Sequence, residues 1–125
     1  MNKFLKLFFT GLILMTGVLM SDAKTKIDPN AQNYNQVRAA HILVETESQA
    51  RGLKLQAEGG EDFAKLAKQF SKCPSGQRGG DLGYFGRGMM VSEFETAAFE
   101  LPKGEISEPV HTDFGWHIIK VIDKK

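Results

Sequence analysis

The sequence has few of the features that commonly stabilise small domains or attract charged partners. It contains a single cysteine, Cys73, which excludes a disulfide within the chain and a zinc site built on paired cysteines. The 16 lysines and arginines nearly balance the 15 acidic residues, so nothing favours nucleic acid or an anionic membrane as a partner. A chain of 125 residues is long enough for one domain, which must be stabilised by its hydrophobic core.

The first 23 residues have the composition of an export signal. Residues 1–6 carry two lysines, and residues 7–20 form an uncharged apolar run, shorter than the roughly 20 residues that a membrane helix needs. The small residues Ser21 and Ala23 predict cleavage after Ala23, with no stable membrane association afterwards. An uncleaved anchor is the alternative. Both interpretations place the domain outside the cytoplasm, in the periplasm or secreted.

The next segment, residues 24–36, mixes charged residues with Asn, Gln and Pro and has almost nothing to bury. This composition predicts a disordered lead-in. The folded domain is therefore expected over residues 37–125.

Apolar periodicity predicts an α+β domain. Residues 37–44 form a short, β-branched apolar run typical of a buried strand. Thr46 and Gln49 have the spacing of a capping box and begin a helix that ends before Gly59. Residues 61–70 place apolar side chains at helical spacing, which predicts a second helix.

The second half of the sequence begins with a glycine-rich segment, residues 75–88, which has six glycines in fourteen residues. We expect no helix there, and only a short strand or packed loop at residues 82–85. The segment lacks the Lys-Ser/Thr ending of a phosphate-binding loop. Ser92 is expected to cap a third helix, and residues 106–112 and 117–123 to form a terminal hairpin. This order predicts a small, largely antiparallel sheet covered by helices.

Three side chains are unusual for their positions: His41 in the first strand, His117 in the last strand, and Cys73 before the glycine-rich segment. Each alone is more often a core residue than a functional one. However, the first and last strands of a small sheet can be neighbours, and two facing imidazoles can share a proton. Such a pair should be neutral or singly protonated near pH 7. His111 lies beside a turn and is expected at the surface.

Apolar side chains that could border a cleft gather in the second half of the sequence. Phe85 and Phe99 are explained by the core. Met90, Phe94 and Phe114 fall at a loop end, a helix start and a hairpin turn, where side chains often border a cleft.

Three segments, AAHILV, CPSGQRGGDLGYFGRGMMVSEF and VHTDFGWHIIKV, resemble the parvulin family of peptidyl-prolyl cis/trans isomerases. The resemblance runs in order from residue 37 to residue 122. It implies a four-stranded antiparallel sheet wrapped by about four helices, in the FKBP-like superfold. It also implies a monomeric enzyme that needs no cofactor or metal and acts on proline-containing polypeptides.

The resemblance also assigns expected roles to individual residues. His41 and His117 match the central histidine pair, and Thr112 matches the hydroxyl that orders them. Cys73 falls where the family has a cysteine or an aspartate beside the substrate peptide bond. The expected pocket for the proline ring comprises Leu82, Met90 and Phe94, bordered by Phe114.

The resemblance bears on specificity as well. Members that prefer phosphorylated residues before proline carry a basic cluster after the first strand, whereas here that link is residues 45–48, with two glutamates. A preference for uncharged or apolar residues before proline is therefore expected. Two alternatives remain open: an exported chaperone that binds peptides without isomerising them, and a thiol hydrolase or metal site that uses Cys73 with the histidines.

Overall fold

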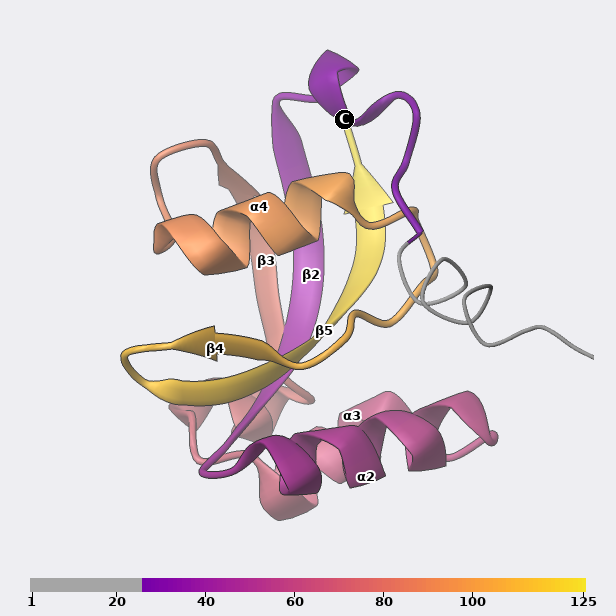
Figure 1. Ribbon diagram of the computed structural model, residues 1–125, viewed down its shortest axis with the longest axis vertical. Helices are drawn as coiled ribbons and strands as arrows, with labels where there is room; N and C mark the ends of the chain where they lie inside the picture. The colour runs from indigo at the N-terminus through magenta and orange to yellow at the C-terminus, as the bar shows by residue number, and fades with distance from the viewer. Residues whose placement is uncertain (1–25) are drawn as a thin grey trace, which may run out of the picture.

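The computed structural model describes residues 26–125, so the predicted export signal lies outside the described residues. No helix within the described part combines the length and apolar character that crossing a membrane requires. Three α-helices and two short 3-10 helices surround one sheet (Figure 1). In chain order the elements are η1 (Ala31–Asn33), β2 (Gln36–Val44), α2 (Glu47–Glu58), α3 (Phe63–Phe70), η2 (Pro74–Arg78), β3 (Asp81–Gly86), α4 (Ser92–Glu100), β4 (Val110–Thr112) and β5 (Gly115–Lys124).

The sheet has four strands in the order β3-β2-β5-β4, and every neighbouring pair is antiparallel. The first and last strands, β2 and β5, are the two central strands and pair over almost their whole lengths. The α+β prediction, with a small four-stranded antiparallel sheet, is therefore confirmed. The terminal hairpin also forms, although β4 is only three residues long and Ile106 contributes one isolated bridge to Lys120.

The two faces of the sheet bury different side chains of the central strands. Odd-numbered residues of β2 and β5, such as Ala39 and Ile119, pack in one core cluster with α4. Even-numbered residues, such as Ile42 and Ile118, pack in a second cluster with α2 and α3. Figure 1 shows α4 on one side of the sheet and α2 with α3 on the other. Because side chains alternate along a strand, this division decides which face receives each histidine.

Two of the three helices begin where capping chemistry predicts. At the start of α2, Thr46 Oγ1 accepts a hydrogen bond from the backbone N–H of Gln49, and the Gln49 side chain accepts one from the N–H of Thr46. The Asp62 side chain caps α3, which starts two residues later than expected. In α4, Ser92 is the first helical residue and Val91 is the N-cap, without a side-chain bond, so the predicted cap at Ser92 is wrong.

The glycine-rich segment is more ordered than expected, because η2 forms a 3-10 turn at its start and residues 81–86 form a strand. The prediction that no helical structure would form there was therefore wrong. Gly80 joins the two elements at a φ of 83°, and its carbonyl accepts a hydrogen bond from His41 N. A Cβ at Gly80 would lie 2.3 Å from the His41 carbonyl oxygen. Only glycine allows this close approach to the histidine strand.

The predicted disorder of the lead-in does not hold for residues 26–36, which pack against the end of the domain. Lys124 Nζ donates to Asp28 Oδ2 at 2.9 Å and to the carbonyl oxygen of Phe99 at 2.8 Å. The Lys124 side chain is only 2% exposed. The N–H of Asn35 also donates to the carbonyl of Lys125. Composition could not reveal this order, because the partners of the segment lie about ninety residues away in the sequence.

Replacing Lys124 with methionine should destabilise the domain. The substitution keeps the apolar stem but leaves the buried Phe99 carbonyl without its donor, which costs about 1–3 kcal/mol in the free energy of unfolding. Urea denaturation monitored by circular dichroism measures this. Lys103→Met is the matched control, because the Lys103–Asp123 pair is exposed and its loss should change little. Equal stabilities for Lys124→Met and the wild type would contradict the structural role of the ion pair.

Candidate active site

The two predicted histidines meet on the α4 face of the sheet. His41 of β2 lies opposite Ile119, and His117 of β5 lies opposite Leu43, which makes the two histidines a diagonal cross-strand pair. Their Nδ1 atoms are 3.0 Å apart, and their ring planes are nearly parallel, 18° from one another. Both residues are buried. Segments 76 positions apart in the sequence thus share one hydrogen bond in the core.

A hydroxyl group lies at each outer end of the histidine pair. Thr112 Oγ1 is 2.7 Å from His117 Nε2 and accepts a hydrogen bond from the N–H of Phe114. Ser75 Oγ is 3.1 Å from His41 Nε2. The structure therefore brings Thr112 to the position expected for it and adds Ser75, which the sequence reasoning missed. The sequence signal that could have indicated this role is the position of the Ser75 hydroxyl, two residues after Cys73 and at the start of the glycine-rich segment.

The resulting chain, from Ser75 through the two imidazoles to Thr112, admits two proton arrangements. Only one hydrogen fits between the two Nδ1 atoms. If His41 provides it, His41 Nε2 accepts from Ser75 and His117 Nε2 donates to Thr112. If His117 provides it, both outer bonds reverse. Either arrangement satisfies all four ring nitrogens with both rings neutral, so the pair needs no net charge to be fully hydrogen-bonded.

Burial is the main electrostatic influence on the two imidazoles. Together with a smaller contribution from the neighbouring His117, burial lowers the pKa of His41 to about 4. Burial likewise lowers the pKa of His117 to about 4, with a smaller contribution from His111. Both rings are therefore neutral at pH 7, because a charged imidazole would be poorly solvated there.

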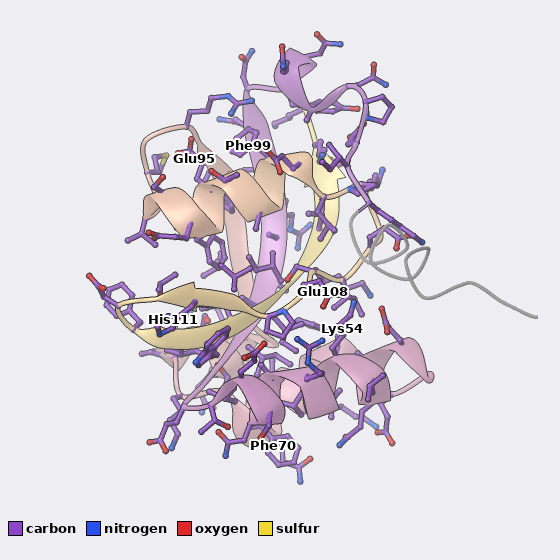
Figure 2. All side chains as sticks on the ribbon, in the orientation of Figure 1. Lys54, Phe70, Glu95, Phe99, Glu108 and His111 are labelled. Carbon is purple, nitrogen blue, oxygen red and sulfur yellow. The ribbon has the colours of Figure 1, made fainter. Side chains whose placement is uncertain are left out.

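His111 lies on the exposed side of the terminal hairpin, as expected (Figure 2). Its ring stacks on Trp116, with the ring centroids 4.5 Å apart. It takes no part in the hydrogen bonds between His41 and His117.

Phe94, from α4, covers the histidine pair. Its ring makes edge contacts with both imidazoles, at centroid distances of 5.5 Å to His41 and 5.3 Å to His117. It also packs against Phe85 of β3. Because Phe94 is itself buried, it helps to exclude water from the imidazole bonds and forms a wall shared by the core and the neighbouring cavity.

A cavity of about 570 Å³ opens beside the histidine pair. All of the residues expected to hold or border the proline ring line it, together with both histidines and the cysteine: His41, Cys73, Leu82, Met90, Phe94, Phe114 and His117. Five further lining residues were not predicted: Leu43, Lys72, Pro74, Met89 and Val91. The cavity is thus mostly apolar, with a few polar groups on one side, as expected of a small-ligand site.

The rim of this cavity exposes unusually large apolar side chains. Phe114 is 71% exposed and Met89 is 68% exposed, whereas Phe94 in the wall is almost fully buried. Phe114 therefore borders the opening and does not form its floor. Apolar side chains held open to solvent in this way favour contact with an apolar partner.

The β3–α4 loop that carries Met89 and Met90 is anchored by Arg87. Its guanidinium lies 4.1 Å above the ring centroid of Phe99 and donates to the carbonyl oxygen of Ala31. The lead-in thus holds the loop that forms one wall of the cavity. The contact links the lead-in, whose composition predicts disorder, to the candidate site.

Cys73 lines the cavity as a free, half-buried thiol. Each imidazole nitrogen already has another hydrogen-bond partner, and in residues 26–125 no hydrogen bond joins the thiol to either ring. The same residues contain no group of three or more His, Cys, Asp or Glu side chains that could hold a metal ion. The arrangement therefore provides no base for a thiol nucleophile, which argues against the hydrolase alternative.

A second groove, of about 450 Å³, lies away from the histidines. Charged side chains form much of its lining, among them Lys54 and Glu108, which are labelled in Figure 2. It contains none of the predicted site residues.

Comparison with known proteins agrees with this geometry. The sequence matches the family described as the PPIC-type PPIase domain over residues 23–125. The chain therefore belongs to the PPIC-type peptidyl-prolyl isomerase family, the parvulins, and the resemblance seen in the sequence is confirmed.

Individual relatives include bacterial and archaeal proteins. The foldase protein PrsA of Geobacillus sp. (strain WCH70) is 56% identical over 96 residues, which are 75% of this chain but only 35% of that protein. A crystal structure of the peptidylprolyl isomerase PrsA from Bacillus anthracis has a TM-score of 0.72 at 41% identity, covering 86% of this chain and 50% of that one. The solution structure of the parvuline of Nitrosopumilus maritimus has a TM-score of 0.67 at 47% identity, covering 71% and 97%.

The lowered pKa values of the histidines predict a pH-dependent stability. The unfolded histidines bind protons near pH 6.5, whereas the folded pair binds them only near pH 4, so acidification between these values favours unfolding. Between pH 7 and pH 4.5 we expect the free energy of unfolding to fall by roughly 2–4 kcal/mol. Denaturant titrations at each pH measure the fall, and NMR titration follows each ring.

The exposed His111 provides the control for this experiment. His111→Gln should retain nearly all of the pH-dependent loss of stability, because that loss belongs to the buried rings. Titration of either His41 or His117 near pH 6.5 in the folded protein would show that burial does not keep the pair neutral.

Proposed function

We propose that this protein is an exported peptidyl-prolyl cis/trans isomerase that accelerates rotation about X-Pro bonds in unfolded or folding polypeptides. One observation carries the proposal: an apolar cavity bordered by Leu82, Met90 and Phe94 opens directly beside the hydrogen-bonded His41–His117 pair. The cavity, of about 570 Å³, is large enough for a pyrrolidine ring, and the exposed rim residues Met89 and Phe114 are accessible to the rest of a bound polypeptide. The foldase relatives support an unfolded protein as the substrate.

The proposed mechanism is non-covalent. Rotation about an X-Pro bond has a barrier of roughly 20 kcal/mol because the amide loses its resonance, and no bond has to break. A dry apolar cavity disfavours the planar, dipolar amide relative to the twisted one, whose separated charge is smaller. Holding the proline ring against Met90 and Phe94 would allow the preceding residue to rotate relative to a fixed ring.

The histidine pair is a positioning element in this proposal. Its neutral rings and the two flanking hydroxyls form a rigid base under the cavity, because all four ring nitrogens have partners. Thr112 extends this base to the hairpin turn through the N–H of Phe114. The network thus fixes the shape of the cavity between β2, β5 and η2.

Cys73 is proposed to act on the substrate electrostatically. Its thiol lines the cavity together with the two histidines. Among the described residues, no proton-accepting side chain forms a hydrogen bond with this thiol. A polar group there can act electrostatically on the carbonyl oxygen of the peptide bond while that bond rotates. A thiol, a hydroxyl or a carboxylate at this position would each supply such a group.

The central test is acceleration of cis/trans exchange in short X-Pro peptides, measured by NMR exchange spectroscopy without a coupled protease. Met90→Ala should lower kcat/KM roughly tenfold, because about 1.5 kcal/mol of apolar contact with the ring is lost. Leu55→Ala is the matched control, since Leu55 is an exposed apolar residue on α2. No rate enhancement by the wild-type protein, or equal activity of Met90→Ala, would refute the proposal.

Replacement of Cys73 by serine and by aspartate distinguishes the mechanisms. If the thiol acts electrostatically, both variants should retain isomerase activity within about tenfold of the wild type, because each keeps a polar group at the cavity wall. The same exchange assay measures this, with circular dichroism to verify folding. Complete loss of activity in two folded variants would instead indicate a nucleophilic thiol.

A second candidate function is supported by the open apolar rim. Met89, Val91 and Phe114 are exposed large hydrophobic residues at one cavity, a surface suited to holding unfolded chains. A chaperone of this kind would bind proline-free and proline-containing peptides alike and would not accelerate isomerisation. Peptide affinity without rate enhancement would favour it.

A further inference from the structure

One charged side chain borders the cavity. Among the lining residues only Lys72 carries a full charge at pH 7, because both imidazoles are neutral there. Its backbone N–H donates to the carbonyl oxygen of Leu43 at 2.8 Å, which fixes the segment between α3 and η2 against the end of β2. Its side chain is 55% exposed, so the ammonium group is accessible to a bound polypeptide.

A carboxylate lies next to this ammonium group. Glu45 Oε2 is 3.6 Å from Lys72 Nζ, and its side chain is 71% exposed. Glu45 follows β2 directly but does not line the cavity. An exposed pair of this kind contributes little to stability, so its charges remain free to act on a ligand. Lys72 also immediately precedes Cys73, the residue proposed to lie beside the rotating peptide bond.

The position of the pair has an electrostatic consequence for substrates. Lys72 attracts an acidic side chain next to proline, whereas Glu45, whose Oε2 lies 3.6 Å from Lys72 Nζ, repels it. A basic side chain is attracted by Glu45 and repelled by Lys72. For either charge the attraction and the repulsion oppose one another, whereas an uncharged side chain loses no hydration of a charge.

We propose that Lys72 and Glu45 together form a charge filter at the cavity, in which each residue cancels the attraction that the other alone would exert on a charged residue next to proline. The inference rests on the proposed isomerase function and assigns its specificity to two residues. Glu45 alone would repel a phosphorylated or acidic residue, as the sequence suggested, and Lys72 alone would attract it. The observed pair balances the two effects.

The test compares four peptides that differ only before proline, with Ala, Glu, Lys or phosphoserine at that position. Their isomerisation is measured with the wild type, Glu45→Gln, Lys72→Gln and the double variant. Glu45→Gln should raise the ratio of kcat/KM for the Glu peptide over the Lys peptide by roughly two- to fivefold, and Lys72→Gln should lower it by a similar factor. The double variant should return to the wild-type ratio.

Two controls separate a local charge effect from other causes. Lys103→Gln removes a lysine that is also exposed and paired, in this case with Asp123, and should leave the Glu-to-Lys ratio unchanged. Raising the ionic strength to about 0.5 M should reduce the changes in both single variants, because exposed charges are screened. Changes that persist at high salt would indicate an altered cavity shape and would overturn the charge filter.

The failures of the two proposals are distinguishable. Isomerisation with an unchanged Glu-to-Lys ratio in both single variants overturns the charge filter alone. A shift of both variants in the same direction also overturns it, because the two residues carry opposite charges. Absence of isomerisation of every peptide by the wild type overturns the isomerase function and the filter together. Faster turnover of the phosphoserine peptide than of the Ala peptide by the wild type would also contradict the filter.

Discussion

The arrangement of the candidate site depends on the hydrogen bond between the Nδ1 atoms of His41 and His117. It can form only where β2 and β5 are adjacent and in a register that places both residues on the same face. Two buried imidazoles need partners for four nitrogens, and Ser75 and Thr112 provide the outer two. Elements as distant as η2 and β4 are therefore positioned by the same polar chain.

The cavity depends on that chain for its base and on α4 for its wall. Phe94 contacts both imidazoles on one side and lines the cavity on the other, so core packing and cavity shape are inseparable at this residue. Met90 reaches the cavity from a loop that Arg87 anchors to the lead-in. A cavity of this size in so small a domain thus depends on the packing of the whole structure.

The sequence was sufficient for the order of the elements, because periodicity and motif order are local signals, and the resemblance to the parvulins indicated the pairing of the histidines. It was insufficient for the other contacts between distant segments. Asp28 gives no indication of a partner at Lys124, and Ser75 resembles an ordinary loop residue until η2 places it beside His41. The 3-10 turn was not predicted, because a glycine-rich segment argues against helical structure. Pro74 was the opposing signal, since its fixed φ suits the first residue of a turn.

The pairing of β2 with β5 also determines when the site can form during synthesis and folding of the chain. Strands that lie at opposite ends of the domain sequence must meet, and closing so long a loop is slow compared with forming the local helices. During synthesis, His41 leaves the ribosome long before His117. A nascent chain that lacks β5 therefore has neither the imidazole pair nor the cavity base, and the site can form only once β5 has been synthesised.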